Sequence, residues 1–148
     1  MRGFEVVSTY SPDKINLPKR ATEGSAGYDF ESAEDVVIPV GGTALVKTGV
    51  KVYMNANEFL QVQIRSSLAK DGGLMLLNSV GIVDSDYADN PKNEGEVMFL
   101  FYNAGRYDYK IEKGQRMGQG IFQAFLTVDN EKKVTEKRTG GYGSSGKK

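Results

Sequence analysis

The amino-acid sequence predicts an all-β fold, and three observations support this prediction. Short segments rich in β-branched and aromatic residues recur along the chain, separated by clusters of Gly, Pro, Asn and Asp. Several of these segments alternate apolar and polar residues, as half-buried strands do. No window of ten or more residues keeps a helical period. The 148 residues suffice for one domain with a substantial core, so we expect a single β-barrel or sandwich.

The first part of the chain contains several expected strands. Residues 4–10 are rich in β-branched and aromatic side chains and predict the first strand. Residues 21–30 combine two glycines with small side chains, a pattern that lets another group approach the backbone or forms a tight turn into a strand. Strands over 35–40 and 43–54 flank Gly41-Gly42, which indicates a hairpin.

The clearest strand pattern lies at 58–65, where apolar and polar residues alternate. Arg65 ends this strand on its polar side, directly before the segment 66–69 (SSLA), which predicts one short helical turn stopped by Gly72-Gly73. A guanidinium, two hydroxyls and the free N–H groups of a helix start form a reasonable anion site. An N-capped turn with a surface arginine explains the same segment equally well.

The second half of the chain continues with strands. A polar, turn-rich loop over 88–94 precedes residues 97–102, which are apolar on both faces and predict a strand buried on both sides. Alternation over 107–112 predicts a half-buried strand, and the last long strand is expected over 116–128.

The tail from residue 131 has a different composition. A charged segment leads into a glycine- and serine-rich end that is too poor in apolar residues to fold alone. We therefore expect a core over 1–130 and a flexible C-terminal arm over 131–148. The arm is either a disordered terminus or a segment that closes on a ligand, with Tyr142 as its anchor.

Composition restricts the chemistry that this chain can perform. It has no cysteine and no histidine, which excludes thiolate nucleophiles, Cys/His zinc sites and His-dependent catalytic pairs. A metal would be a hard cation with oxygen ligands, Mg²⁺ by default, and a general base would be a carboxylate. The formal net charge is zero, so no global basic field holds nucleic acid. No signal sequence or membrane-spanning run is evident, and we expect a cytoplasmic protein without direct DNA or membrane binding.

The segment LLNSVGIVDSDY, residues 76–87, holds the densest group of candidate site residues. An amide (Asn78), a glycine (Gly81), two carboxylates (Asp84 and Asp86) and a ring (Tyr87) suit a small polar ligand. In an extended segment, residues two apart point to the same side, so the two carboxylates would share a face and Tyr87 would face the other side. A surface β-turn uses the same residue types and is the alternative.

Five short segments in order, AGYDF, RSSLAKDGGL, NSVGIVDSDY, GQRMGQGIF and GGYGSSG, resemble the motifs of the trimeric dUTPase family of bacteria and phages. The resemblance covers nearly the whole chain. It implies a jelly-roll-like, distorted β-barrel that assembles as a homotrimer, with each active site built from three subunits and covered by the C-terminal arm. The implied reaction is Mg²⁺-assisted hydrolysis of dUTP to dUMP and pyrophosphate, which limits uracil in DNA and supplies dUMP.

Carried over position by position, the resemblance assigns roles to individual residues. It makes Asp84 the base that activates water for attack at the α-phosphorus, and it makes Asp29 a magnesium ligand through water. Asn78 and Gly81 would read the uracil edge, and Tyr87 would pack on the deoxyribose. The implied substrate-binding residues are Arg65, Ser66, Ser67, Asn78, Gly81, Tyr87, Gln119, Arg138, Tyr142, Gly143, Ser144 and Ser145, with Tyr142 stacking over uracil.

Three departures from the family pattern leave alternatives open. Ser67 stands where the family usually has glycine, and RSSLA is closer to dCTP deaminases, so a deaminase or bifunctional relative is one alternative. The loop 88–94 is an insertion, and a nucleotide-gated regulatory protein that binds a repressor-type partner is another. The arginine of the family's tail falls at Lys137, with Arg138 next to it, and we favour Arg138 as the γ-phosphate contact.

Overall fold

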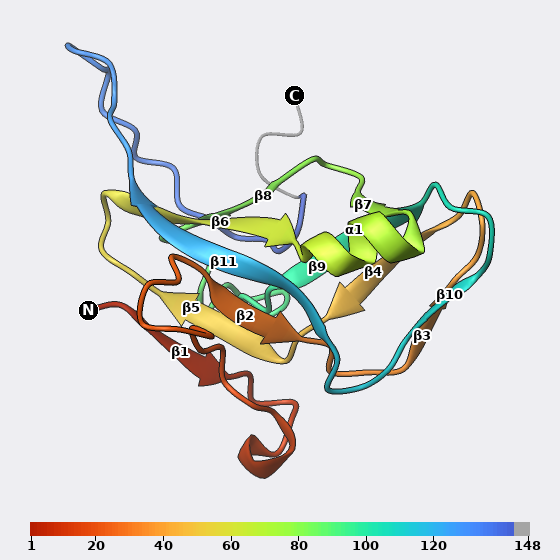
Figure 1. Cartoon of the computed structure of the whole chain (residues 1–148). Coiled ribbons are helices and arrows are strands. Elements are labelled where there is room, and N and C mark those ends of the chain that lie inside the picture. The colour runs from red at the N-terminus through yellow and green to blue at the C-terminus, as the bar shows by residue number, and fades with distance from the viewer. Residues whose placement is uncertain (144–148) are drawn as a thin grey trace.

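The computed structural model describes residues 1–143 and confirms the all-β prediction (Figure 1). The strands are β1 (Gly3–Val6), β2 (Tyr28–Glu31), β3 (Val36–Ile38), β4 (Thr43–Lys47), β5 (Val50–Tyr53), β6 (Glu58–Ile64), β7 (Leu74–Leu76), β8 (Gly81–Asp84), β9 (Met98–Asn103), β10 (Tyr109–Ile111) and β11 (Arg116–Ala124). The described helices are the 3-10 helix η1 (Pro12–Lys14) and the α-helix α1 (Ser66–Gly72).

All the strand pairs of the described chain are antiparallel, and most join strands that are distant in sequence. The largest sheet has the order β2-β11-β6-β8, and a second has the order β4-β9-β7. Two further pairs, β1-β5 and β3-β10, complete the fold. Long connections between neighbouring strands are characteristic of jelly-roll-like barrels, in which few strands pair with their sequence neighbours.

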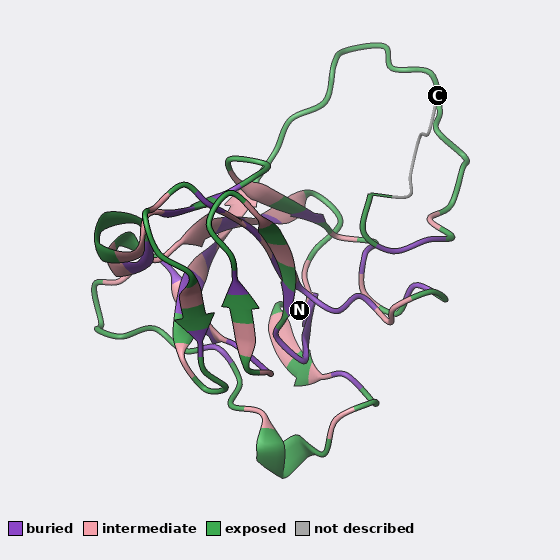
Figure 2. Cartoon of the chain, turned by 90° about the vertical axis from the view of Figure 1, so that its right-hand side faces the viewer, coloured by how far each residue is buried: buried purple, intermediate pink, exposed green. Residues whose placement is uncertain are grey.

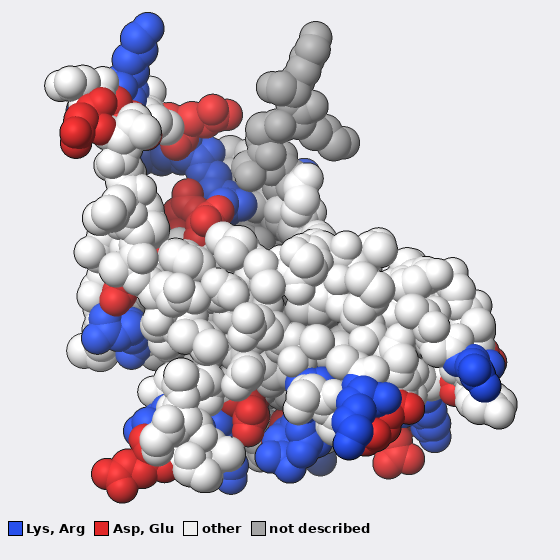
Figure 3. All heavy atoms as spheres, turned by 45° about the horizontal axis from the view of Figure 1, so that its top comes forward, with Lys and Arg blue, Asp and Glu red and all other residues white. Residues whose placement is uncertain are grey.

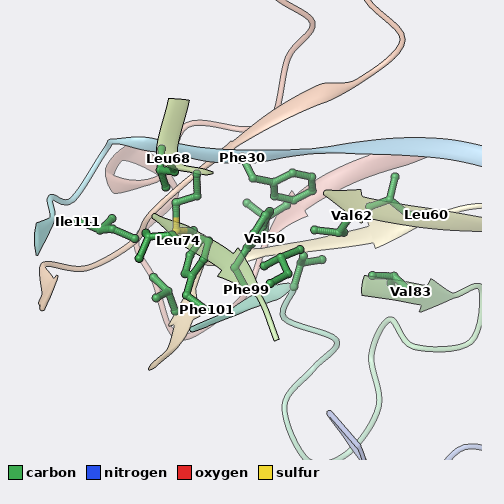
Figure 4. Packing of buried hydrophobic residues seen from close by; sticks show 14 of the residues in the cluster. Phe30, Val50, Leu60, Val62, Leu68, Leu74, Val83, Phe99, Phe101 and Ile111 are labelled. Carbon is green, nitrogen blue, oxygen red and sulfur yellow. The ribbon is translucent and has the colours of Figure 1, made fainter. Parts of the chain in front are cut away.

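The core fills the space between these sheets, and alternation along the strands decides which side chains enter it. Figure 4 shows Phe30 of β2, Leu60 and Val62 of β6 and Phe99 of β9 among the side chains packed inside. The alternation read over 58–65 is therefore confirmed, because Leu60 and Val62 are almost fully buried.

The predicted helical turn after β6 is also confirmed. Arg65 occupies the N-cap position of α1, and Leu68 is the buried residue of this helix. Gly73 ends the helix in the left-handed region at φ 69°, where its N–H reaches the carbonyl oxygens of Leu68 and Ala69. Glycine adopts this conformation without a steric cost, so the helix stops where the sequence indicated.

The hairpin expected across Gly41-Gly42 is wrong. The glycines do form a turn, in which the N–H of Gly42 donates to the carbonyl of Pro39 at 2.8 Å. The strands on either side nevertheless belong to different sheets, since β3 pairs with β10 and β4 pairs with β9. The turn at Gly41-Gly42 was predicted correctly from local residue types. The partners of the two flanking strands are instead determined by residues that are distant in sequence.

Four other strand predictions need correction. The strand expected over 43–54 is two strands, because Gly49 has a positive φ of 73° between β4 and β5. β1 ends at Val6 and β11 at Ala124, earlier than expected. In this chain β9 is buried on one face and only half-buried on the other, so the apolar run over 97–102 does not mark a strand enclosed on both sides.

Glycines in β11 allow this strand to pack closely on its neighbours. A Cβ at Gly118 would lie 2.2 Å from the carbonyl oxygen of Gln63 and 2.4 Å from the ring of Phe99.

Beyond β11 the chain is exposed over 126–137 and stands away from the body of the molecule before it returns (Figure 2). The return of this arm brings residues 138–143 against β8.

Candidate active site

The returning arm and the end of β8 enclose a cavity of about 300 Å³. Its lining combines apolar side chains, several of them from the core, with polar side chains of the central stretch and of the arm. The lining residues are Val62, Asn78, Gly81, Ile82, Val83, Asp84, Tyr87, Val97, Met98, Arg138, Gly141, Tyr142 and Gly143. An apolar pocket with a few convergent polar groups is the usual form of a small-molecule site.

Of the two carboxylates of the central stretch, Asp84 lines this cavity and Asp86 lies in the turn that follows it. Asp84 is the last residue of β8, and the N–H of Tyr87 closes a turn onto its carbonyl oxygen at 3.1 Å. Asp86 therefore lies in a turn, whereas the sequence interpretation assumed an extended segment. The expectation that the two carboxylates share a side holds, because the turn leaves both within reach of one cation.

That cation is Arg138 of the arm. Its Nη2 donates to Asp84 at 2.6 Å and its Nε donates to Asp86 at 2.8 Å. The hydrogen bond to Asp86 is the main reason why the pKa of Arg138 is raised above its ordinary value. The arginine side chain is only 12% exposed, so the arm is held closely at this point. In Figure 3, basic and acidic side chains meet in a recess between the arm and the body.

Tyr87 forms one wall of the cavity and is largely buried. Its ring lies beneath the guanidinium of Arg138, with 5.7 Å between the guanidinium carbon and the ring centroid. Its hydroxyl donates to the carbonyl oxygen of Glu96 at 3.1 Å and accepts from Nδ2 of Asn93 at 2.8 Å. Burial raises the pKa of Tyr87. The expectation that this ring faces away from the carboxylates fails, because the turn brings it to the same cavity.

Asn78 and Tyr142 meet across the mouth of the cavity. The side-chain amide of Asn78 donates to the hydroxyl of Tyr142 at 3.3 Å. Gly81 lies next to them, where a Cβ would be 3.3 Å from Cβ of Val62 and 3.9 Å from the Asn78 amide nitrogen. Burial raises the pKa of Tyr142. An amide edge, an open backbone and a phenol ring therefore face one space.

A second group of predicted residues lies elsewhere in this chain. Arg65, Ser66 and Ser67 stand at the start of α1, and none of them lines the cavity. Gln119, in the middle of β11, pairs with Asp29 of β2. The structure thus keeps these four predicted phosphate-binding residues apart from the predicted base and uracil site, whereas Arg138 and Gly143 of the arm line the cavity itself.

Asp29 is the candidate ligand for magnesium. Its Oδ2 lies 3.7 Å from Nη1 of Arg116, and about a quarter of its side chain is exposed. Among residues 1–143 there is no group of three acidic side chains that could hold a metal ion. A single carboxylate fits Mg²⁺ where the ion keeps waters and takes its remaining ligands from substrate phosphates.

Two residues that contact the Tyr87 hydroxyl were not singled out from the sequence. Asn93 and Glu96, which bind the Tyr87 hydroxyl, come from the loop expected to be a surface insertion and from the segment after it. The only signal for them was their nearness in sequence to Tyr87.

Ser144 and Ser145 lie outside the described residues, whereas Gly143 does line the cavity.

None of the helices described over residues 1–143 has the length and apolar character needed to cross a membrane.

Comparison with known proteins gives one consistent result. The family model for dUTPase matches residues 13–146. A deoxyuridine 5'-triphosphate nucleotidohydrolase of Lactococcus lactis is 49% identical over 147 residues, covering 99% of this chain and 98% of that protein. The crystal structure of a Streptococcus mutans dUTPase has a TM-score of 0.82 at 43% identity and covers 86% of this chain and 98% of its own.

A more distant structure agrees in fold. A dUTPase variant from phage phi11 of S. aureus, described with a structural Mg(II) ion, has a TM-score of 0.74 at 21% identity. The match covers 92% of this chain and 97% of that one.

Proposed function

We infer that this chain, which belongs to the dUTPase family, is a dUTP diphosphatase and hydrolyses dUTP to dUMP and pyrophosphate. The observation that best supports this reaction in the molecule itself is the cavity shared by Asn78, Asp84, Tyr87 and Tyr142. It combines groups suited to a pyrimidine edge, a sugar and an activated water. The comparisons name dUTPases, so they favour dUTP hydrolysis over the deaminase alternative.

Asp84 is the general base of this proposal. Its carboxylate takes a proton from water as the water oxygen attacks the α-phosphorus of dUTP. The bond from the α-phosphorus to the bridging oxygen then breaks, and pyrophosphate leaves with both electrons of that bond. Support comes from the exposed position of Asp84 at the rim of the cavity, where a bound water can reach it.

The base and the sugar of dUTP are read by the inner part of the cavity. Asn78, whose amide can donate and accept, pairs with the uracil edge together with the backbone near Gly81. Tyr142 stacks over the ring, which requires its hydroxyl to leave Asn78 when the substrate enters. Tyr87 packs against the deoxyribose and leaves no room for a 2′-hydroxyl.

The triphosphate is held by residues at the start of α1 and in β11. Arg65, Ser66 and Ser67 supply a guanidinium and two hydroxyls, and Gln119 supplies an amide. We propose that a homotrimer brings this group to the cavity of a neighbouring subunit, because the two groups are separate within one chain. Gly143, Ser144 and Ser145 of the arm complete the phosphate site.

Mg²⁺ is the implied cofactor, and Asp29 would hold it through water. The chemistry that the ion supplies is charge neutralisation on the triphosphate, which makes pyrophosphate a better leaving group. Asp29 is partly exposed and adjacent to Gln119, which suits a carboxylate that acts beside the phosphates.

The chain divides by role into a core over 1–130 and an arm over 131–148 that closes the site. Arg138 is our choice for the γ-phosphate contact, and Lys137 is exposed. Since Arg138 is engaged by Asp84 and Asp86, it must exchange carboxylate for phosphate as the substrate binds. A regulatory protein partner at loop 88–94 remains a prediction.

The decisive experiment measures pyrophosphate release from dUTP, dCTP, dTTP and UTP with Mg²⁺, for the wild type and for Asp84→Asn. Turnover confined to dUTP and lowered by about 10²-fold or more in the variant is expected. Asp71→Asn, an exposed carboxylate on α1, serves as the matched control. Ammonia release from dCTP would indicate a deaminase, and full activity of Asp84→Asn would refute the assigned base.

A further inference from the structure

The insertion between Tyr87 and β9 is tied firmly to the core. Two of its acidic residues, Asp89 and Glu94, accept hydrogen bonds from the ammonium of Lys51 at 2.7 and 2.8 Å, respectively. Burial opposes the charge on this lysine, but the hydrogen bonds to Asp89 and Glu94 outweigh it and raise the pKa of Lys51. The carboxylate of Glu94 also accepts from the backbone N–H of Ser8 at 3.0 Å. The loop is therefore a fixed part of the fold.

Inside the loop, the side chain of Asn90 fixes the backbone turn over residues 90–93. Asn90 is buried, and its Oδ1 accepts from the backbone N–H groups of Lys92 and Asn93, both at 3.1 Å. Its Nδ2 donates to the carbonyl oxygen of Tyr87 at 2.8 Å and to Oδ1 of Asn93 at 2.7 Å. The side chain of Asn93 is thus held in one orientation by its own loop.

The amide nitrogen of the Asn93 side chain contacts Tyr87 of the cavity. Nδ2 of Asn93 donates to the Tyr87 hydroxyl at 2.8 Å, and the hydroxyl donates onward to the carbonyl oxygen of Glu96. The phenol is therefore used as acceptor and as donor at once. A ring held at its hydroxyl cannot tilt without breaking a buried hydrogen bond, which costs free energy.

The same amide also contacts the arm. A Cβ at Gly141 would lie 2.8 Å from both Cγ and Nδ2 of Asn93, closer than carbon atoms approach in folded proteins. Gly141 is buried at this contact, three residues after Arg138 and one before Tyr142. Only a residue without a side chain lets the arm lie this close to the loop.

We propose that Asn93 is a positioning residue that links discrimination of the sugar to docking of the arm. It fixes the Tyr87 ring against the deoxyribose. Its side chain is also the surface against which Gly141 packs when the arm covers the nucleotide. The proposal rests on the proposed function. It gives the loop 88–94 an internal role, in place of the unknown surface role expected from the sequence.

The first test compares Asn93→Ala with the wild type on dUTP and on UTP. We expect kcat/KM for dUTP to fall by about tenfold and the preference for dUTP over UTP to fall as well, because the ring is no longer held. In a Tyr87→Phe background, which has no hydroxyl to hold, Asn93→Ala should change the preference by less than about twofold. Lys92→Ala is the control, since this loop side chain is exposed.

The second test substitutes the arm, and its first comparison keeps the loop unchanged. Gly141→Ala is expected to raise KM for dUTP by about tenfold with a smaller change in kcat, because the added methyl group meets Asn93. The same substitution in an Asn93→Ala background should raise KM by less than about twofold, since space for the methyl group is then present. Thr139→Ala, an exposed neighbour, is the control.

Arm docking can also be observed directly, because the chain has no tryptophan. With Tyr142→Trp as the single reporter, a non-hydrolysable dUTP analogue should shift the fluorescence less in Asn93→Ala than in the parent. If the wild type hydrolyses dUTP but Asn93→Ala keeps full sugar preference and Gly141→Ala costs the same in both backgrounds, the proposal is wrong. If the wild type does not hydrolyse dUTP, the proposed function itself fails.

Discussion

The guanidinium of Arg138 donates a 2.6 Å hydrogen bond to the carboxylate of Asp84. The arm residue assigned to the γ-phosphate thus lies on the residue assigned as general base. In this arrangement the arm lines the cavity, and Arg138 pairs with the carboxylate that we propose as the proton acceptor. Substrate binding and activation of the base therefore both require Arg138 to change partners, and the first two predictions below follow from this exchange.

Asp86→Asn is expected to strengthen substrate binding. The substitution replaces the carboxylate that accepts from Nε of Arg138, so the guanidinium is held less firmly and the triphosphate competes for it more easily. KM for dUTP should fall by about threefold or more, with kcat changed much less. Steady-state kinetics at fixed Mg²⁺ measures both, and Glu136→Gln, an exposed acid on the arm, is the control. An increase in KM would show that Asp86 assists binding.

Arg138→Ala and Lys137→Ala distinguish the two candidate contacts for the γ-phosphate. Removing the arginine should weaken binding of a non-hydrolysable dUTP analogue by about tenfold or more, and should weaken dUMP binding much less, because dUMP has no γ-phosphate. Arg138→Lys should recover only part of the loss, since an ammonium cannot bind two oxygens as a guanidinium does. Isothermal titration calorimetry gives these constants. Equal losses for dUMP and the analogue would contradict the assignment.

Gly118→Ala is expected to destabilise the fold. The new methyl group would lie 2.2 Å from the carbonyl oxygen of Gln63, and this backbone atom cannot move without disturbing the pairing of β11 with β6. Overpacking of this kind lowers the free energy of unfolding by about 2 kcal/mol or more, which thermal denaturation detects as a lower Tm. Gly24→Ala, where the methyl group meets nothing within 4 Å, should leave Tm nearly unchanged.

The Lys51–Glu94 pair predicts a dependence of stability on acid pH. Hydrogen bonds from Lys51 and Ser8 lower the pKa of Glu94 from 4.5 to about 2. A carboxylate with a lowered pKa in the folded state gives stability that is complete above its unfolded pKa and is lost as pH falls toward the folded value. Tm should therefore decrease between pH 4.5 and 2 more steeply in the wild type than in Glu94→Gln. Parallel Tm curves for the two proteins would exclude this contribution.

Local patterns predicted those parts of the molecule that local physics determines. The alternation in β6, the start of α1 after Arg65 and its end at Gly73 follow from side-chain periodicity and from the backbone freedom of glycine. The sequence also singled out Asn78, Asp84 and Tyr87, because an amide, a glycine, two carboxylates and an aromatic ring fall within ten positions there. These residues do meet at one cavity.

Long-range contacts could not be predicted in the same way. Gly41-Gly42 fits a hairpin locally, but β3 and β4 find partners more than fifty residues away, and no local signal specifies them. The contact of Arg138 with Asp84 joins positions 54 apart. Asn93 looked like an ordinary loop residue, since its importance comes from the Tyr87 hydroxyl and the Gly141 backbone that the fold brings to it.

The exposed segment 126–137 also determines how strongly any ligand must bind. A short flexible tether keeps its end at an effective concentration in the millimolar range, roughly, around the surface it can reach. Arg138 and Tyr142 therefore occupy their sites through modest contacts, since association with the tethered end has already been made intramolecular. A nucleotide that enters the cavity competes against this high local concentration of the arm. It displaces these contacts only if Arg138 and Tyr142 bind it more tightly than they bind Asp84, Asp86 and Asn78. Nucleotides that bind weakly therefore leave the arm in place.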